Sequence, residues 1–290
     1  MEGKTVEYVK LANGIEIPKI GYGVFQISKD DAPRCVREAI ETGYRHIDTA
    51  QSYFNEAEVG QGIKDSGIDR KDLFLTTKIW ISNYGYENTL RSVDVSLKKL
   101  GTDYLDLVLL HQPFSDTYGA WRALEKLYKD GVIRAIGVSN FYPDRLADMV
   151  AFNEIAPMVD QVETNPLNQQ IEARKNMVKR GVAQGSSGSS GGMQNMFSNP
   201  TLARIGEAHG KSVAQVILRW LTQRDIVALP KSTHKERMEE NLNIFDFRLS
   251  DSEMATIAGL DTKTSMFFRH DTPEAVDRFV GYVKERAGRE

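Results

Sequence analysis

Hydrophobic positions along this chain follow two alternating patterns. Short apolar runs rich in β-branched residues are separated by longer stretches whose apolar residues recur with helical spacing. The short runs predict seven strands, at residues 19–26, 46–50, 73–80, 106–111, 135–140, 159–164 and 226–232. One helical stretch carries Leu90, Val93, Leu97 and Leu100 on a single face, and Gly101 follows at a position that suits a helix end. A strand followed by a helix is therefore the repeating unit.

This alternation narrows the fold to two architectures. Strands joined by helices run parallel through right-handed crossovers, which builds either an open doubly wound sheet or a closed eight-stranded barrel. The open dinucleotide-binding sheet would carry Gly-x-Gly-x-x-Gly after its first strand, but Gly21 and Gly23 lack the third glycine. We therefore predict an α/β fold of the (β/α)8 TIM-barrel class. The chain of 290 residues suits a single barrel domain spanning residues 1–290.

The N-terminal segment predicts a β-hairpin ahead of the barrel. Asn13 and Gly14 stand between two runs of alternating character, which is a strong signal for a two-residue turn. The hairpin either plugs the N-terminal end of the barrel or lies on its surface without a further role.

One stretch breaks the alternation. After a helical segment at residues 172–180 the seventh barrel strand is due, but residues 185–192 contain only glycine and serine. Such a run behaves as a flexible linker, because it has too little apolar surface to offset the entropy lost on ordering. We therefore predict that the seventh strand is missing or disordered, with residues 185–192 forming a linker within the domain. An engineered loop explains this segment, and a natural low-complexity loop is the alternative.

Composition and charge restrict the class of protein and its partners. Hydrophobic residues make up 41% of the chain and charged residues 27%, which is typical of a globular protein with a large core. The net charge of −3 leaves no excess of cations, so neither nucleic acid nor an anionic membrane is expected as the main partner. The N-terminus lacks the apolar run of a signal peptide, and no apolar stretch is long enough to span a bilayer. We predict a cytoplasmic protein, and the single Cys35 excludes an intrachain disulfide.

Four polar residues fall at the same end of their predicted strands. Asp48, Lys78 and His111 lie at or near the ends of three strands, and Tyr53 follows Asp48 by five residues. The carboxyl ends of barrel strands gather at one face, where active sites of this fold lie. Taken singly, each residue has a structural alternative, such as half of an ion pair, a hydrogen-bonded core histidine or an aromatic residue in a turn. Taken together, they favour a catalytic site.

These side chains suit proton transfer to a carbonyl oxygen. A buried Lys78 needs a partner, and Asp48 is the natural one. The remaining positive field is expected to favour the phenolate of Tyr53 and to lower its pKa from about 10. Tyr53 would then donate a proton as hydride reaches the carbonyl carbon, while neutral His111 orients the oxygen. An aldolase-type role for Lys78 as a Schiff-base former requires a lysine that loses its proton, which an adjacent Asp48 opposes.

The same residues resemble the catalytic tetrad of the aldo-keto reductase superfamily. The matching segments are residues 48–56, 77–78 and 110–111, and residues 137–141, 160–163 and 229–241 resemble further signatures in the family's order. The resemblance covers nearly the whole chain, and the bacterial 2,5-diketo-D-gluconate reductase-like branch is the nearest in appearance. It implies an NADP-dependent enzyme, expected to be a monomer, that reduces aldehyde, ketone or dicarbonyl groups to alcohols by hydride transfer, with Tyr53 as proton donor.

The resemblance also implies a binding site for NADPH. Ser139, Asn140 and Gln161 would hold the nicotinamide carboxamide. The second group of cofactor residues is Lys231, Ser232, Arg237, Glu240 and Asn241. Within it, the two cations would bind the phosphate on the adenosine ribose and the last two residues would contact adenine, which favours NADPH over NADH. Without the resemblance, a solvated charged helix is the alternative interpretation of this second segment. The resemblance implies no metal site.

Several aromatic and tail residues are similar in placement to the family's substrate pocket. They are Val24, Phe25, Trp80, Phe114, Phe267, Phe268 and His270. Core packing is the alternative for each aromatic residue. An apolar cup with a few polar groups suits small aldehydes, ketones or α-dicarbonyls, and the residues do not single out one of them.

The chain departs from the family pattern at the seventh strand. Family members carry an aromatic residue there that stacks on the nicotinamide, followed by a loop over the pyrophosphate, and residues 185–192 supply neither. Because the tetrad is intact, we expect the linker to impair cofactor binding and barrel closure rather than proton transfer. Two hypotheses follow: an NADPH-dependent reductase with impaired activity, or a non-catalytic or engineered barrel scaffold that retains the tetrad.

Overall fold

Eight parallel strands form one continuous sheet in the computed structural model, which describes residues 6–187, 194–267 and 269–287. The strands are β3 (Tyr22–Gly23), β4 (His46–Asp48), β5 (Phe74–Ile79), β6 (Leu107–Leu110), β7 (Ile136–Ser139), β8 (Val159–Glu163), β9 (Ala183–Ser187) and β10 (Ile226–Ala228). Their order in the sheet follows the chain from β3 to β10. A parallel bridge between Ile20 and Ala228 joins the first strand segment to the last, and Gly23 N–H donates to Pro230 O at 3.0 Å. The predicted (β/α)8 barrel is therefore confirmed.

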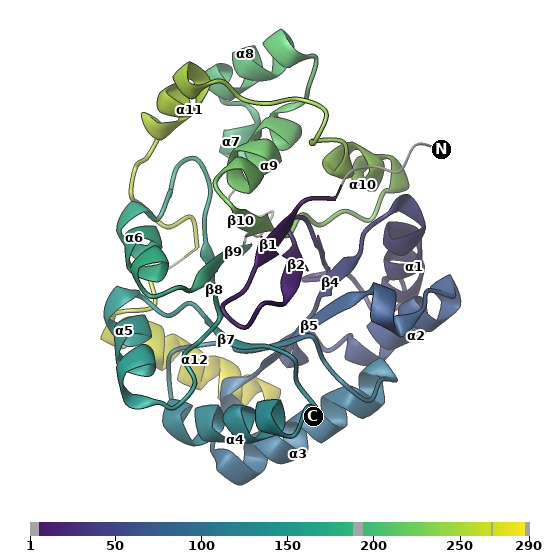
Figure 1. The fold of residues 1–290 in the computed structure, drawn as a ribbon, viewed down its shortest axis with the longest axis vertical. Helices are drawn as coiled ribbons and strands as arrows, with labels where there is room; N and C mark the ends of the chain where they lie inside the picture. The colour runs from purple at the N-terminus through teal and green to yellow at the C-terminus, as the bar shows by residue number, and fades with distance from the viewer. Residues whose placement is uncertain (1–5, 188–193, 268, 288–290) are drawn as a thin grey trace.

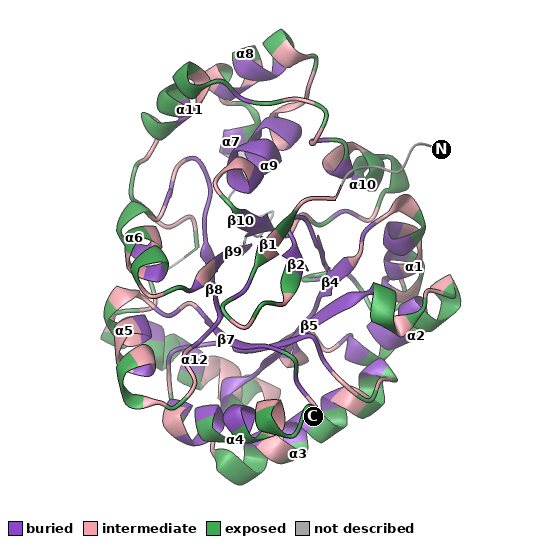
Figure 2. Ribbon diagram, in the orientation of Figure 1, coloured by how far each residue is buried: buried purple, intermediate pink, exposed green. Residues whose placement is uncertain are grey.

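Helices surround the strands as a ring (Figure 1). They are α1 (Ala32–Thr42), α2 (Glu56–Ser66), α3 (Tyr86–Leu100), α4 (Thr117–Lys129), α5 (Pro143–Phe152), α6 (Ile171–Lys179), α7 (Gln194–Phe197), α8 (Pro200–His209), α9 (Val213–Gln223), α10 (Lys235–Leu242), α11 (Asp251–Ala258) and α12 (Pro273–Arg286). Three short 3₁₀ segments are η1 (Gln51–Tyr53), η2 (Arg70–Asp72) and η3 (Ile81–Asn83). Figure 2 shows the barrel strands almost wholly buried, whereas the helices have both buried and exposed positions.

Local sequence signals explain where individual helices begin and end. α3 ends before Gly101, whose φ of +67° is costly for residues with a Cβ, so the predicted helix end is confirmed. α9 begins with a capping box in which Ser212 and Gln215 each accept a hydrogen bond from the backbone of the other. The chain thus turns from each helix toward the next strand at positions that its own residues favour.

The N-terminal hairpin is present, with a turn one residue longer than expected. β1 (Tyr8–Lys10) and β2 (Glu16–Pro18) pair antiparallel. Leu11 N–H donates to Ile15 O at 2.8 Å, so three residues form the loop, and Gly14 has a φ of +89°. Leu11 and Ile17 are buried in the main hydrophobic cluster, and Figure 1 shows the hairpin at the centre of the view among the barrel strands.

The prediction that the seventh strand is missing or disordered is wrong. β9 contains Ala183–Ser187 and pairs in parallel with both neighbours, through five residue pairs with β8 and three with β10. Its last three residues, 185–187, belong to the Gly/Ser run that was expected to be a linker. Residues 188–192 of that run lie outside the described residues, and the origin of the segment stays a prediction.

β9 forms because a β-ladder uses backbone groups, which glycine and serine possess like any other residue. Its buried polar side chains are also satisfied. Gln184 Nε2 donates to Thr164 Oγ1 at 2.8 Å, and Ser186 Oγ donates to Thr164 O at 2.9 Å. Gly185 lies close to Gln161, where an added Cβ would be 3.2 Å from Gln161 Cγ. The strand is therefore held by hydrogen bonds and close approach rather than by apolar side chains.

No helix among residues 6–187, 194–267 and 269–287 is both long enough and apolar enough to cross a membrane.

Candidate active site

The four residues singled out by their strand positions meet at the carboxyl ends of β4, β5 and β6. Asp48 ends β4, and Lys78 lies near the end of β5. His111 directly follows β6 and donates its backbone N–H to Ile79 O at 3.1 Å. Tyr53 ends η1, the short 3₁₀ turn that leads out of β4. The parallel register of the strands therefore brings these side chains together, although they are 63 positions apart in the sequence at the extremes.

Lys78 and Asp48 form a buried ion pair. The Lys78 ammonium is fully buried and donates to Asp48 Oδ1, and it also donates to Thr49 O at 3.0 Å. Burial by itself disfavours the charged ammonium, but attraction to Asp48 and Tyr53 outweighs that cost, so the pKa of Lys78 is raised. Lys78 therefore holds a permanent positive charge at the bottom of the site.

Tyr53 lies above this pair. Its hydroxyl is 3.5 Å from Lys78 Nζ, and the ammonium is 5.2 Å from the centre of its ring. The expectation of a lowered pKa is corrected, because burial raises the pKa of Tyr53 by more than the positive charge of Lys78 lowers it. The hydroxyl accordingly keeps its proton at neutral pH, which is the form that a proton donor requires.

His111 is neutral. Burial lowers its pKa well below the usual range, and the positive charges of Lys78 and Arg286 lower it further. Its Nδ1 is 3.2 Å from Ser52 Oγ, and its ring lies 5.8 Å from that of Tyr53, measured between centroids. Tyr53 and His111 thus face the same space from two sides.

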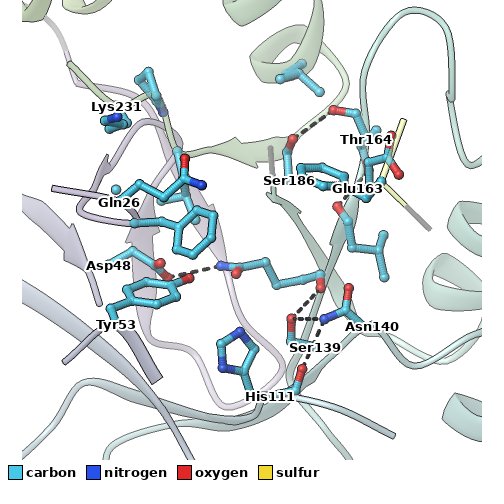
Figure 3. A pocket seen from close by; sticks show the side chains of 18 of the residues that line it. Gln26, Asp48, Tyr53, His111, Ser139, Asn140, Glu163, Thr164, Ser186 and Lys231 are labelled. Atoms are coloured by element: carbon cyan, nitrogen blue, oxygen red, sulfur yellow. Dashed lines mark hydrogen bonds between the residues drawn. The ribbon is translucent and has the colours of Figure 1, made fainter. Parts of the chain in front are cut away.

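Amide and hydroxyl groups on β8, at the end of β7 and directly after β7 contact these four residues (Figure 3). Gln161 Nε2 donates to Asp48 Oδ2 at 3.1 Å, and Ser139 Oγ donates to Gln161 O at 2.8 Å. Asn140 Nδ2 donates to His111 O at 3.0 Å. Asn140 has a φ of +63°, a conformation that asparagine tolerates better than most residues. The three residues expected to hold the nicotinamide carboxamide therefore border the four candidate catalytic residues.

A single large cavity joins these residues to the second group of expected cofactor residues. Its volume is about 950 Å³, and its wall includes Asp48, Tyr53, His111, Ser139, Asn140, Gln161, Lys231, Ser232, Arg237, Glu240 and Asn241. Lys78 lies beneath the wall, behind Asp48 and Tyr53. Figure 3 shows Lys231 and His111 at opposite ends of the view, with Asp48 and Tyr53 between them. The cavity therefore has a cationic end, a reactive centre and an opposite, largely aromatic end.

Four of the seven expected substrate-pocket residues line the cavity: Phe25, Trp80, Phe267 and His270. The placement of Val24 and Phe114 in this wall is corrected. Val24 is fully buried behind the wall, because its backbone pairs with β4 and holds Asn55. Phe114 lines a smaller neighbouring cavity and packs on Phe279, with 5.2 Å between ring centroids. Phe268 lies outside the described residues.

The sequence interpretation missed the C-terminal helix α12. Phe279, Tyr282 and Arg286 project from it into the wall of the main cavity. The signal was present, because these residues have the spacing of one helical face. Ser52, which holds His111, was also missed. Its signal was weak, since a serine in a turn has many ordinary roles.

Comparison with known proteins finds a matching family model and similar sequences. The sequence model described as "Aldo/keto reductase family" matches residues 19–262. The chain is 49% identical to a glyoxal reductase of Bacillus subtilis over 255 residues, covering 87% of this chain and 92% of the relative.

Solved structures agree with that match. An aldo-keto reductase of Bombyx mori in complex with NADP superposes with a TM-score of 0.87 at 32% identity, covering 93% of this chain and 99% of the other. A putative 2,5-diketo-D-gluconic acid reductase B superposes with a TM-score of 0.88 at 38% identity, covering 94% and 98%. Structural similarity and sequence similarity therefore point to the same family.

Proposed function

The chain belongs to the aldo/keto reductase family of oxidoreductases, and from this premise we propose that it reduces aldehyde, ketone or dicarbonyl groups to alcohols with NADPH. The observation that carries the proposal is the chain of contacts from Asp48 through Lys78 to the protonated Tyr53, opposite neutral His111. The similarity to a glyoxal reductase supports small carbonyl and dicarbonyl compounds as the substrate class.

Tyr53 is the proposed proton donor to the carbonyl oxygen. Its hydroxyl is protonated, points into the cavity and has the Lys78 ammonium on its far side. As charge develops on the carbonyl oxygen, Tyr53 gives up its proton, and the nearby ammonium stabilises the phenolate that remains. Neutral His111 donates a hydrogen bond from its ring and fixes the oxygen within reach of Tyr53. Ser52 orients that ring by its contact with Nδ1.

The residues of the cavity fit NADPH. Ser139, Asn140 and Gln161 offer amide and hydroxyl groups beside the reactive centre, and the cations Lys231 and Arg237 lie in the wall of the same cavity. NADPH bound there would supply the hydride. Lys231, Ser232 and Arg237 would hold the phosphate on the adenosine ribose, and Glu240 and Asn241 would contact the adenine.

The rival function is a barrel scaffold that keeps these residues without catalysis. It was favoured by the idea of a missing seventh strand. The observed pairing of β9 removes much of that support, because the barrel closes without apolar side chains in this strand. The absence of an aromatic residue from the described strand β9 still favours weaker cofactor binding than an aromatic platform would allow.

Titration of the protein with NADPH and NADH, followed by cofactor fluorescence, tests the proposal. The wild type should bind NADPH more tightly than NADH, and Arg237→Ala should weaken NADPH about 10- to 100-fold, the scale of a charge-assisted hydrogen bond, while changing NADH little. Arg91→Ala on α3 is a matched control, since it removes an exposed arginine outside the cavity wall. A wild type without saturable NADPH binding would favour the scaffold, and equal losses for both coenzymes would make Arg237 a structural residue.

A further inference from the structure

The first strand and the first helix of the barrel support the cationic end of the cavity. Ser232 O accepts a hydrogen bond from the Tyr22 hydroxyl in β3. Thr233 O accepts one from Arg34 Nη1 in α1 at 3.4 Å. α1 also packs against α10, the helix that follows this segment (Figure 1). The hydrogen-bonded partners are 210 and 199 positions apart in the chain, so only closure of the barrel brings them together.

Tyr22 is one of two buried tyrosines behind this segment. Its side chain is fully buried, and its ring meets the Tyr44 ring edge-on, with 5.5 Å between centroids. Burial raises the pKa of the Tyr22 hydroxyl, which therefore keeps its proton and can donate it in a hydrogen bond. A hydroxyl removed from water costs free energy unless it finds polar partners, and here these are the Ser232 carbonyl and the Cys35 thiol.

Ser232 shapes the turn that leads into α10. His234 N–H donates to Ser232 Oγ at 3.0 Å, and the helix begins at the next residue, Lys235. Ser232 is also part of the cavity wall, together with the exposed cations Lys231 and Arg237. The backbone position of Ser232 therefore determines how its own hydroxyl and the adjacent Lys231 face the cavity.

Tyr44 supports the other half of the same segment. Its hydroxyl donates to Met238 O in α10 at 3.3 Å. Burial raises the pKa of Tyr44, and a hydrogen bond with the Asn241 side chain lowers it in part. Asn241 is one of the two residues proposed to contact adenine. Tyr22 and Tyr44 thus reach different parts of the proposed cofactor site, Tyr22 the phosphate part and Tyr44 the adenine part.

We propose that Tyr22 is a positioning residue that strengthens the preference for NADPH over NADH, because it fixes Ser232 where the phosphate on the adenosine ribose would bind. The inference rests on the proposed reductase function. Tyr22 acts through Ser232, since its own side chain lies wholly behind the cavity wall. A segment that is ordered before the coenzyme arrives loses less conformational entropy on binding, so it binds the phosphate more tightly.

Calorimetric titration of Tyr22→Phe with four ligands tests the proposal. NADPH and adenosine 2′,5′-bisphosphate carry the phosphate on the ribose, whereas NADH and adenosine 5′-monophosphate do not. Tyr22→Phe keeps the ring and its packing, and it should weaken the first two ligands about 3- to 10-fold, the scale of a neutral hydrogen bond, while changing the other two little. In steady-state assays the loss should appear in KM for NADPH, with kcat close to the wild type.

Two further tyrosine variants separate positioning from a general loosening of residues 231–241. Tyr104→Phe removes a hydroxyl that donates to Arg70 O at 3.3 Å outside the cavity wall, and it should leave the affinities for all four ligands unchanged. Tyr44→Phe removes a buried hydroxyl at the adenine part, and it should weaken all four ligands alike, because all of them carry adenine. A change in the NADPH-to-NADH preference as large in Tyr44→Phe as in Tyr22→Phe would overturn the proposal.

Equal affinities of the wild type and Tyr22→Phe for adenosine 2′,5′-bisphosphate would also overturn it, and so would equal losses for NADPH and NADH. A wild type that binds the bisphosphate but reduces no carbonyl compound would refute the proposed function alone, and the bisphosphate titration would still decide the role of Tyr22. A wild type that binds neither NADPH nor the bisphosphate would refute both.

Discussion

Two parts of this barrel build parallel strands from opposite kinds of side chain. β5 and β6 consist of buried and mostly apolar residues, among them Leu75, Val108 and Leu109. β9, across the barrel, has the sequence AQGSS and takes part in the same hydrogen-bonded ladder. In β5 and β6 the burial of apolar area stabilises the strand, whereas in β9 backbone bonds and satisfied polar side chains do so. A barrel strand can therefore be polar, provided that its neighbours supply the packing.

The proposed catalytic residues come from the apolar side. Asp48 in β4 and Lys78 in β5 form a buried ion pair, and Thr49 O and the Gln161 amide are their further hydrogen-bond partners. Because the pair is buried away from water, its field on Tyr53 is screened less than it would be at the surface. The β8 and β9 side presents the neutral groups of Gln161 and Ser186 to the cavity, together with the Glu163 carboxyl. Only the side of the barrel with β4 and β5 therefore places a buried ion pair next to Tyr53.

Breaking the charged pair should have the largest effect. Lys78→Met should abolish turnover and destabilise the protein by about 3–5 kcal/mol, because Asp48 would remain buried without its partner. Chemical denaturation and steady-state assays would measure the two effects. The double variant Asp48→Asn with Lys78→Met should recover much of the stability without recovering activity. Wild-type rates in Lys78→Met would contradict the assigned role.

Removing the proton donor should affect chemistry but not folding. Tyr53→Phe should lower kcat about 100-fold or more, while NADPH affinity and the melting temperature stay close to the wild type. Tyr104→Phe is the control, since it removes a half-buried hydroxyl that donates to Arg70 O at 3.3 Å and lies outside the cavity wall. Parallel losses of turnover and NADPH binding in Tyr53→Phe would show a structural role instead.

Truncating one side chain in the apolar strand β6 and one in the polar strand β9 tests directly what stabilises each strand. Leu109→Ala in β6 should cost about 2–5 kcal/mol, because it removes buried apolar volume from a packed layer. Ser186→Ala in β9 should cost less, about 1–3 kcal/mol, because it removes the hydrogen bond to Thr164 O but only one heavy atom of volume. Urea denaturation measures both. A larger loss in Ser186→Ala than in Leu109→Ala would contradict this ranking.

A buried acid next to β9 should make the polar side sensitive to pH. Asp160 in β8 is fully buried, and burial raises the pKa of its carboxyl well above the usual value, although the backbone N–H of Phe141 lowers it in part. Above pH 4 the unfolded chain loses this proton while the folded chain keeps it, so stability falls by about 1.4 kcal/mol per pH unit until the folded pKa is reached. Asp160→Asn should remove this slope.

The gain in unfolding free energy from Asp160→Asn should therefore be small at pH 4 and should grow toward pH 7. Asp94→Asn on α3 is the control, because Asp94 is exposed and pairs with Lys98 on the surface. Denaturation at both pH values distinguishes the two variants. A gain that is the same at pH 4 and pH 7 would mean that Asp160 is ionised in the folded protein.

The sequence by itself determined the alternation of strands and helices outside β9 and the positions of Asp48, Lys78 and His111 at strand ends. The spacing of apolar residues indicates each strand or helix from its local sequence. Parallel topology then places the carboxyl ends of the strands at one face, as in all barrels of this kind. It also determined where α3 ends, because Gly101 favours that backbone conformation by itself.

Only the tertiary structure decided the rest. β9 forms because β8 and β10 offer it backbone partners, which no property of a Gly/Ser run indicates. The pKa of Tyr53 rises because neighbours from several strands remove it from water, and that cost exceeds the attraction to Lys78. The same holds for the cavity wall, which excludes Val24 and includes Arg286. Strand pairing, the burial of a side chain and its exposure to the cavity each depend on many residues that are far apart in the chain. They therefore take their final values only when the barrel closes.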